Sequence, residues 1–314
     1  AFHRLTTGMK LVIESKLRVL ACFVWGITGI ACSADAGNAS LKAPSDEQIQ
    51  NFWYDGAEIS RFELKQERYG EARPGYAVFV FVTEPFRTTT QVKADTLEPN
   101  TTSILKLNAM REFNTGIYEY NTMTSIFAPI DTDAFPHALK LTTTIQDWCG
   151  HAFSQFNLED EGYRSELRSY FESHGDINET ILGTDVWLED ELWTRIRIDP
   201  TELPVGKFKV IPGSLHLRFA HLRPEAALAE GVIEQNGKLT TYTVVYSALG
   251  RSLSIDFDAS FPHVIRGWTE SGGRNGTKTI AKLVDRIERS YYWSLNKPGD
   301  SKLRKQLGLL EDPR

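Results

Sequence analysis

The hydrophobic pattern along most of this chain is that of β-strands. Residues 76–82 are apolar at both alternating sets of positions, which predicts a central strand covered on two faces. A second strand is predicted at 58–65, with Arg73-Pro74-Gly75 as the turn of a hairpin between them. Thr-rich, aromatic and β-branched runs predict further strands at 104–113, 116–127, 139–145, 152–156 and 163–171.

A helix is predicted at 187–197, where apolar residues recur at helical spacing before Pro200. The pattern then predicts a meander. The apolar positions in residues 277–293 fit both the period of a helix and the alternation of a strand. We expect a strand there, followed by a short helix at 302–309. The strands of this second half are expected at 215–219, 232–235, 239–246, 253–257 and 263–268, with Asn236-Gly237 as a hairpin turn.

These elements predict a mainly β fold of antiparallel sheets, as a curved half-barrel or a sandwich-like body, with one short internal helix and a short C-terminal helix. Residues 49–314 form the β-rich body, and 33–48 a flexible spacer. Two β-layers joined at 187–204 and one continuous curved sheet both fit the pattern.

Residues 1–32 are typical of a secretory signal, with Met9 as the expected true start. Three basic residues precede an apolar run at 19–31, and small residues come after the run. The run is short for a stable membrane span. The alternative is a buried core helix. We expect the signal, and therefore an exported protein of the periplasm or the outer membrane.

The end of the signal allows two processing routes. Gly29-Ile30-Ala31-Cys32 resembles the lipobox of bacterial lipoproteins, in which the cysteine receives the lipid. We therefore expect Cys32 to be lipidated and to anchor the protein to a membrane. Ala34-Asp35-Ala36 is the alternative, with ordinary cleavage after Ala36 and a freely soluble product.

Charge and cysteine content exclude some classes of protein. The formal net charge is −6, and it becomes −9 without residues 1–32, so a nucleic-acid partner is not expected. Only Cys149 of the three cysteines lies in the body. A disulfide framework is therefore absent, unless Cys32 escapes lipidation and pairs with Cys149.

Asp147, Cys149 and His151 are the candidate catalytic residues. On one strand their side chains would share a face, and an imidazole beside a thiol can activate it. A lone cysteine is more often a small core residue. The sequence lacks a P-loop, a GxSxG elbow and zinc-site spacings such as HExxH, so we expect no cofactor, no metal and no catalytic activity.

Other carboxylates and histidines could belong to an active site or a metal site, but ordinary surface or core positions explain them equally well. A glycosidase-like carboxylate pair would draw on Glu58, Glu63, Asp95, Asp131 and Asp133. A metal site would draw on His137, His174, His216, His221 and His263. The aromatic clusters at 52–56 and 290–293 either line an apolar groove or join the first and last strands, and we expect the second.

Seven segments carry a resemblance to a known family: 52–59, 64–66, 68–71, 81–84, 91–95, 113–118 and 146–151. Together they resemble a family of exported proteins from Bacteroidetes-like bacteria that carries the label "septum formation inhibitor Maf". The resemblance runs from Phe52 to about Leu309 and implies no established activity. Maf proteins proper are cytoplasmic nucleotide pyrophosphatases with a Ser-x-Ser-Pro-Arg-Arg loop, which this sequence lacks, so that activity is not expected.

Two hypotheses about function follow. The first is an envelope protein without enzymatic activity that binds an apolar ligand or another envelope protein. The second is an extracytoplasmic hydrolase that uses Cys149 with His151, or a carboxylate pair.

Overall fold

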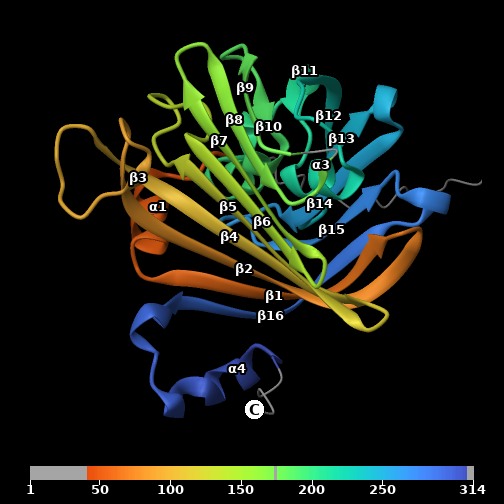
Figure 1. Ribbon diagram of the computed structural model, residues 1–314. Coiled ribbons are helices and arrows are strands. Elements are labelled where there is room, and N and C mark those ends of the chain that lie inside the picture. Colours follow the sequence, from red (N-terminus) through yellow and green to blue (C-terminus); the bar gives the residue numbers. More distant parts are fainter. Residues whose placement is uncertain (1–40, 173–174, 310–314) are drawn as a thin grey trace, which may run out of the picture. The chain divides into compact units, whose positions relative to one another are not determined.

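The computed structural model describes residues 41–172 and 175–309, and one large sheet dominates them (Figure 1). The predicted signal, Cys32 and the first half of the spacer, residues 33–40, lie outside these residues. The strands are β1 (Ala57–Arg68), β2 (Glu71–Arg87), β3 (Val92–Lys93), β4 (Thr101–Thr115), β5 (Tyr118–Pro129), β6 (Lys140–Asp147), β7 (Gly150–Glu159), β8 (Gly162–Ser169), β9 (Ile177–Leu182), β10 (Trp187–Leu188), β11 (Gly206–Ile211), β12 (Ala227–Asn236), β13 (Leu239–Tyr246), β14 (Arg251–Asp258), β15 (Ile265–Ser271) and β16 (Thr279–Ser290). The α-helices are α1 (Asp46–Trp53), α2 (Leu192–Ile198), α3 (Ser214–Ala220) and α4 (Leu303–Gln306).

The sheet is continuous and almost wholly antiparallel, in the order β10-β11-β12-β13-β14-β15-β16-β1-β2-β4-β5-β6-β7-β8-β9. The chain starts at the centre with β1 and builds outward to β9. It then crosses to the opposite edge and returns from β10 to β16, which pairs with β1 (Figure 1). The mainly β prediction is confirmed, and of the two architectures the structure has the single sheet.

Polar contacts on the inner face show how strongly the sheet curves. Seven steps separate β14 from β6 in the strand order, roughly 34 Å across a flat sheet. Yet Arg251 of β14 bonds Glu189 at 2.6 Å, and the next residue, Asp190, accepts from the Ser214 N–H at 2.7 Å. The Ser214 hydroxyl lies 2.5 Å from that of Thr143 on β6. This short relay requires the two flanks to face each other.

The main core lies on the inner face, around α2. All seven residues of α2 are buried, and Trp193 contacts both Phe79 of β2 and Trp268 of β15, with ring centroids 5.6 and 5.4 Å apart. The helix ends at Ile198 because Asp199 is extended and Pro200 follows. Among the described residues, no helix is long and apolar enough to span a membrane.

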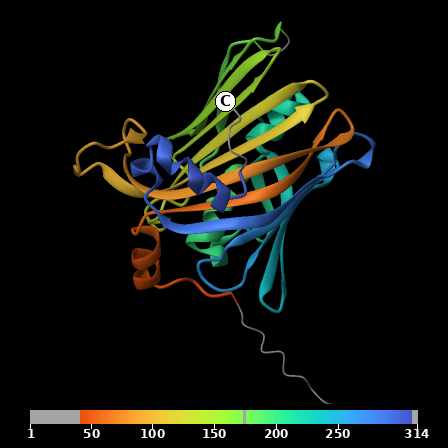
Figure 2. The ribbon, with the colours of Figure 1, turned by 90° about the horizontal axis from the view of Figure 1, so that it is seen from below.

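The outer face of the central strands is also covered, as the apolar pattern of residues 76–82 predicted. Val78, Val80 and Val82 of β2 pack with Ile59 of β1 and with Leu307, which follows α4. Figure 2 shows α4 and the chain before it crossing this face of the sheet. The central strands therefore lie between two apolar layers.

Four local predictions need correction. The helix predicted at 187–197 begins only at Leu192, because residues 187–188 pair with β11 and a 3₁₀ turn follows. The strand predicted at 215–219 is helix α3. The turn of the first hairpin is Tyr69-Gly70, and Arg73-Pro74-Gly75 lies within β2. Helix α1, which a Ser45 capping box begins, includes the last three residues of the predicted spacer.

Candidate ligand-binding site

The C-terminal segment, residues 291–309, is joined at its start to the first helix–strand connection. The Tyr291 hydroxyl donates to Asp55 at 2.7 Å, and Arg289 lies 3.4 Å from the same carboxylate. Tyr292 packs against the outer apolar layer. The aromatic cluster at 290–293 thus connects the two ends of the body through Tyr291, while Phe52 and Trp53 belong to the inner core.

The other end of the segment rests closely on the sheet. Leu307 is only 8% exposed. Gly308 adopts a φ of +58°, and a Cβ atom there would lie 2.9 Å from a carboxylate oxygen of Asp285 on β16. Glycine is required here for both the left-handed backbone and the close approach.

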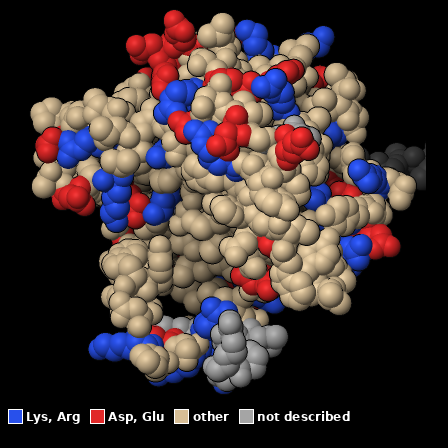
Figure 3. All heavy atoms as spheres, viewed as in Figure 1, with Lys and Arg blue, Asp and Glu red and all other residues tan. Residues whose placement is uncertain are grey.

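Between these two attachments the segment borders an open cavity of about 680 Å³ against the sheet. Its apolar lining comes from Ile59 and Ile287 of the sheet and from Tyr292, Leu295 and Leu307 of the segment. In Figure 3 a recess separates the segment, at the bottom of the view, from the sheet above it. This volume lies within the range of small-molecule sites.

The charged residues of this cavity leave an excess of positive charge. Lys297 and Arg304 line it, and neither forms an ion pair within the part of the chain that the structure describes. Asp300 accepts from the Lys297 backbone N–H at 3.0 Å, and Glu288 pairs with Arg286. The two side-chain cations are therefore available to an anionic group.

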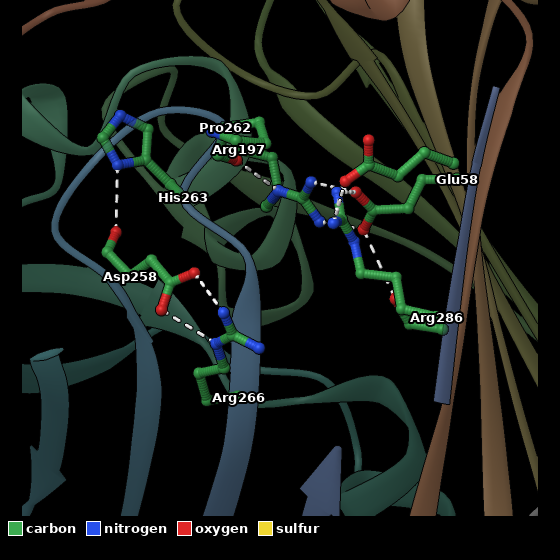
Figure 4. Close-up of polar contacts among 9 residues, drawn as sticks. Glu58, Arg197, Asp258, Pro262, His263, Arg266 and Arg286 are labelled. Carbon is green, nitrogen blue, oxygen red and sulfur yellow. Dashed lines mark hydrogen bonds and ion pairs between the residues drawn. The ribbon is translucent and has the colours of Figure 1, made fainter. Parts of the chain in front are cut away.

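The floor of the cavity is fixed by a buried ion network on the inner face. Glu58 of β1 accepts from Arg197 of α2 at 2.6 Å and from Arg286 of β16 (Figure 4). Burial alone would raise the pKa of Glu58, but Arg197 and then Arg286 lower it from 4.5 to about 2. The network ties β16 and α2 to β1, directly behind Ile59 and Ile287.

Asp147, Cys149 and His151 lie at a different place, beside α3. They border one cleft, but Trp148-Cys149 is the two-residue loop of the β6–β7 hairpin, so the three do not follow one another on a single strand. Asp147 accepts from the N–H groups of Cys149 at 2.6 Å and Gly150 at 3.2 Å. Its carboxylate therefore shapes the turn, and Cys149 and His151 form no hydrogen bond with each other.

The other candidate residues that the structure describes are dispersed over the fold. Glu58 is buried, whereas Glu63 is exposed on the opposite face of β1, so they cannot act as a pair. Asp95, Asp131 and Asp133 lie in loops. No group of three metal-ligating side chains occurs among the residues that the structure describes, with His174 outside them.

Comparisons with known proteins add little to this geometry. No family model matches the chain, and no curated protein matches it. Among solved structures, the immune modulator A of Aeromonas veronii is 8% identical, and the match covers 76% of this chain and 99% of that one. Its TM-score of 0.15 is too low for the likeness to carry an argument.

Sequence reasoning named Tyr291 and Tyr292 but missed Lys297 and Arg304. The sequence predicted a short helix at 302–309, but nothing in its pattern indicated that the C-terminal segment would cross the outer face of the sheet. Only the outer-face valines of β2 indicated that something must cover them.

Proposed function

We propose that this protein is an exported binding protein, without enzymatic activity, for a single-chain amphipathic anion such as a fatty acid. The observation that carries the proposal is the apolar cavity under the C-terminal segment, together with the cations Lys297 and Arg304 in its lining. The apolar chain lies against Ile59 and Ile287, and the anionic head meets the cations.

The outer-face cavity suits an acyl chain better than the space on the inner face does. Helix α2 is buried there throughout, and the cavity lined by Gln66, Arg251 and Glu270 is smaller, at about 300 Å³, and more polar. On the outer face, each methylene that leaves water contributes about 0.8 kcal/mol, so two further carbons should tighten binding about tenfold until the cavity is full.

The hydrolase hypothesis receives less support. A triad needs a carboxylate that orients the imidazole, and Asp147 instead accepts from two amides of its own turn. Glu58 and Glu63 point to opposite faces of the sheet. Binding without chemistry fits these placements better.

Export and a lipid on Cys32 remain part of the proposal, supported by the pattern of residues 9–32. Long-chain amphiphiles concentrate at membranes, so a protein tethered there by acyl chains would meet its ligand at high local concentration.

The test is a fluorescence titration of the protein with a fluorescent long-chain fatty acid, displaced by unlabelled acids of increasing length. The doubly substituted K297Q/R304Q protein should bind about tenfold more weakly. K278Q, which removes an exposed lysine outside the cavity, is the matched control and should bind as the wild type does.

A neutral alcohol of equal chain length should also bind about tenfold more weakly than the acid. The proposal fails if acid and alcohol bind equally, if the double variant behaves like K278Q, or if affinity does not depend on chain length.

A further inference from the structure

A second cavity, which we call the aromatic cleft, lies beside α3 at the end of the sheet where the hairpins turn. Its volume is about 130 Å³. Its walls include Arg68, Tyr69, Tyr120, Ile145, Phe171 and Arg218. The cleft shares no lining residue with the cavity under the C-terminal segment, and the argument for it is independent of the proposed function.

Arg68 is a half-buried cation that aromatic rings surround. Its guanidinium carbon lies 4.3 Å from the ring centre of Tyr69, 5.3 Å from Tyr120 and 4.5 Å from Phe219. It donates to the Phe219 carbonyl at 2.9 Å, and its buried Nε has no partner. Within residues 41–172 and 175–309, no carboxylate pairs with it.

Arg218 of α3 is a second half-buried cation at this cleft. It donates to the Leu222 carbonyl and forms no ion pair within the described chain. Burial lowers the pKa of Arg218, and Glu179 offsets only part of this effect. Arg68 and Arg218 therefore border one small cleft without an ion-pair partner. Asp147 is the carboxylate in the same lining, and it accepts from two amides of its own turn. Two half-buried cations against one carboxylate are an arrangement that a bound anion would stabilise.

Tyr69 occupies a backbone position that tyrosine rarely takes. The β1–β2 hairpin has a two-residue loop in which Tyr69 and Gly70 both have positive φ, 59° and 82°. Asn, Asp or Gly normally fills the first of these positions. Here the strained turn holds an aromatic ring against Arg68, with the Tyr69 hydroxyl 2.8 Å from that of Tyr120.

We propose that the aromatic cleft binds a small planar anion, namely a single-ring aromatic carboxylate. A cavity of about 150 Å³ accommodates benzene in a protein core, so about 130 Å³ with an open mouth suits one ring. The ring lies among Tyr69, Tyr120 and Phe171, and the carboxylate receives hydrogen bonds from Arg68 and Arg218.

Calorimetric titration with benzoate tests this site, with two comparison ligands. Benzamide keeps the ring and loses the charge; cyclohexanecarboxylate keeps the charge and loses the flat ring. Each should bind about tenfold more weakly than benzoate. Equal binding of benzoate and benzamide, or no benzoate binding at millimolar concentration, overturns the proposal without any variant.

Substitutions then place the ligand. R218Q should weaken benzoate about tenfold, and R218K, which keeps the charge but loses the planar fork, should weaken it less. R274Q removes an exposed arginine that does not border the aromatic cleft and should leave binding unchanged. If R218Q binds benzoate as R274Q does, the site is wrong. Binding of the fatty acid should be the same in all three variants.

Discussion

Replacement of Glu58 by Gln removes the buried negative charge that joins three elements. Glu58 is 2% exposed and bonds Arg197 and Arg286. Its pKa falls from 4.5 to about 2 in the fold, and at 1.36 kcal/mol per pH unit this corresponds to about 3 kcal/mol of stability. The loss of one partner from a buried ion pair typically costs a similar amount. E58Q should therefore lose about 3 kcal/mol at pH 7.

The dependence on pH has a definite sign. Because the pKa of Glu58 is lowered in the folded protein, its contribution is complete above about pH 4.5 and disappears as pH falls toward 2. Urea unfolding followed by tryptophan fluorescence suits the measurement, since Trp53 lies 4.8 Å from the Arg197 guanidinium carbon. Wild type and E58Q should differ at pH 7 and converge near pH 2.

E63Q is the matched control, because Glu63 lies on the same strand but is exposed. It should unfold like the wild type. In a double-mutant cycle, R197M should cost less in the E58Q background than alone, because its charge partner is already gone. If E58Q unfolds like E63Q at pH 7, or if its deficit persists at pH 2, the assigned role of Glu58 is refuted.

Three further predictions concern other parts of the chain. Burial raises the pKa of Asp190 from 3.8 to about 6, so ionisation of its carboxyl group lowers stability as pH rises from about 4 to 6. In urea unfolding, D190N should be more stable than the wild type by up to about 3 kcal/mol at pH 8 and equally stable at pH 3. Equal stability of the two proteins at pH 8 would contradict this. G308V places a branched side chain against Asp285, so hydrogen exchange in residues 303–309 should accelerate while the inner core stays protected; unchanged exchange would count against the close approach. Intact mass spectrometry of the native protein should find a lipid on Cys32, whereas a start at Gly37 means ordinary cleavage and a start at Met9 refutes export.

The sequence specified most of the strands because their side chains alternate between two environments. It also revealed a covered central strand at 76–82, where both faces are apolar. The strand prediction at 215–219 was wrong although Leu215, Leu217 and Phe219 alternate as in a strand. The segment is a helix, and the buried Asp190 carboxylate accepts from the N–H of its first residue, Ser214. Tertiary contact decided its conformation, and no local pattern reveals such a contact.

The candidate site was less accessible to sequence reasoning. The cavity exists only because residues 291–309 cross strands that precede them by more than 200 positions. In the sequence, Lys297 and Arg304 look like ordinary surface charges. Only the position of residues 291–309 against the sheet shows that both line the cavity. Strand β9 was missed because it lies at the edge of the sheet, where none of its residues is fully buried and its apolar residues are few. Strand β11, which has only the two-residue β10 beyond it, is short and alternates with two lysines.

Photo-crosslinking with a diazirine-labelled fatty acid tests the central claim most directly. After irradiation, peptide mapping should place the label on β16 and on residues 291–309, and K297Q/R304Q should reduce the yield about tenfold at the same ligand concentration. Label confined to the aromatic cleft, or spread evenly over surface peptides in both proteins, would contradict the account.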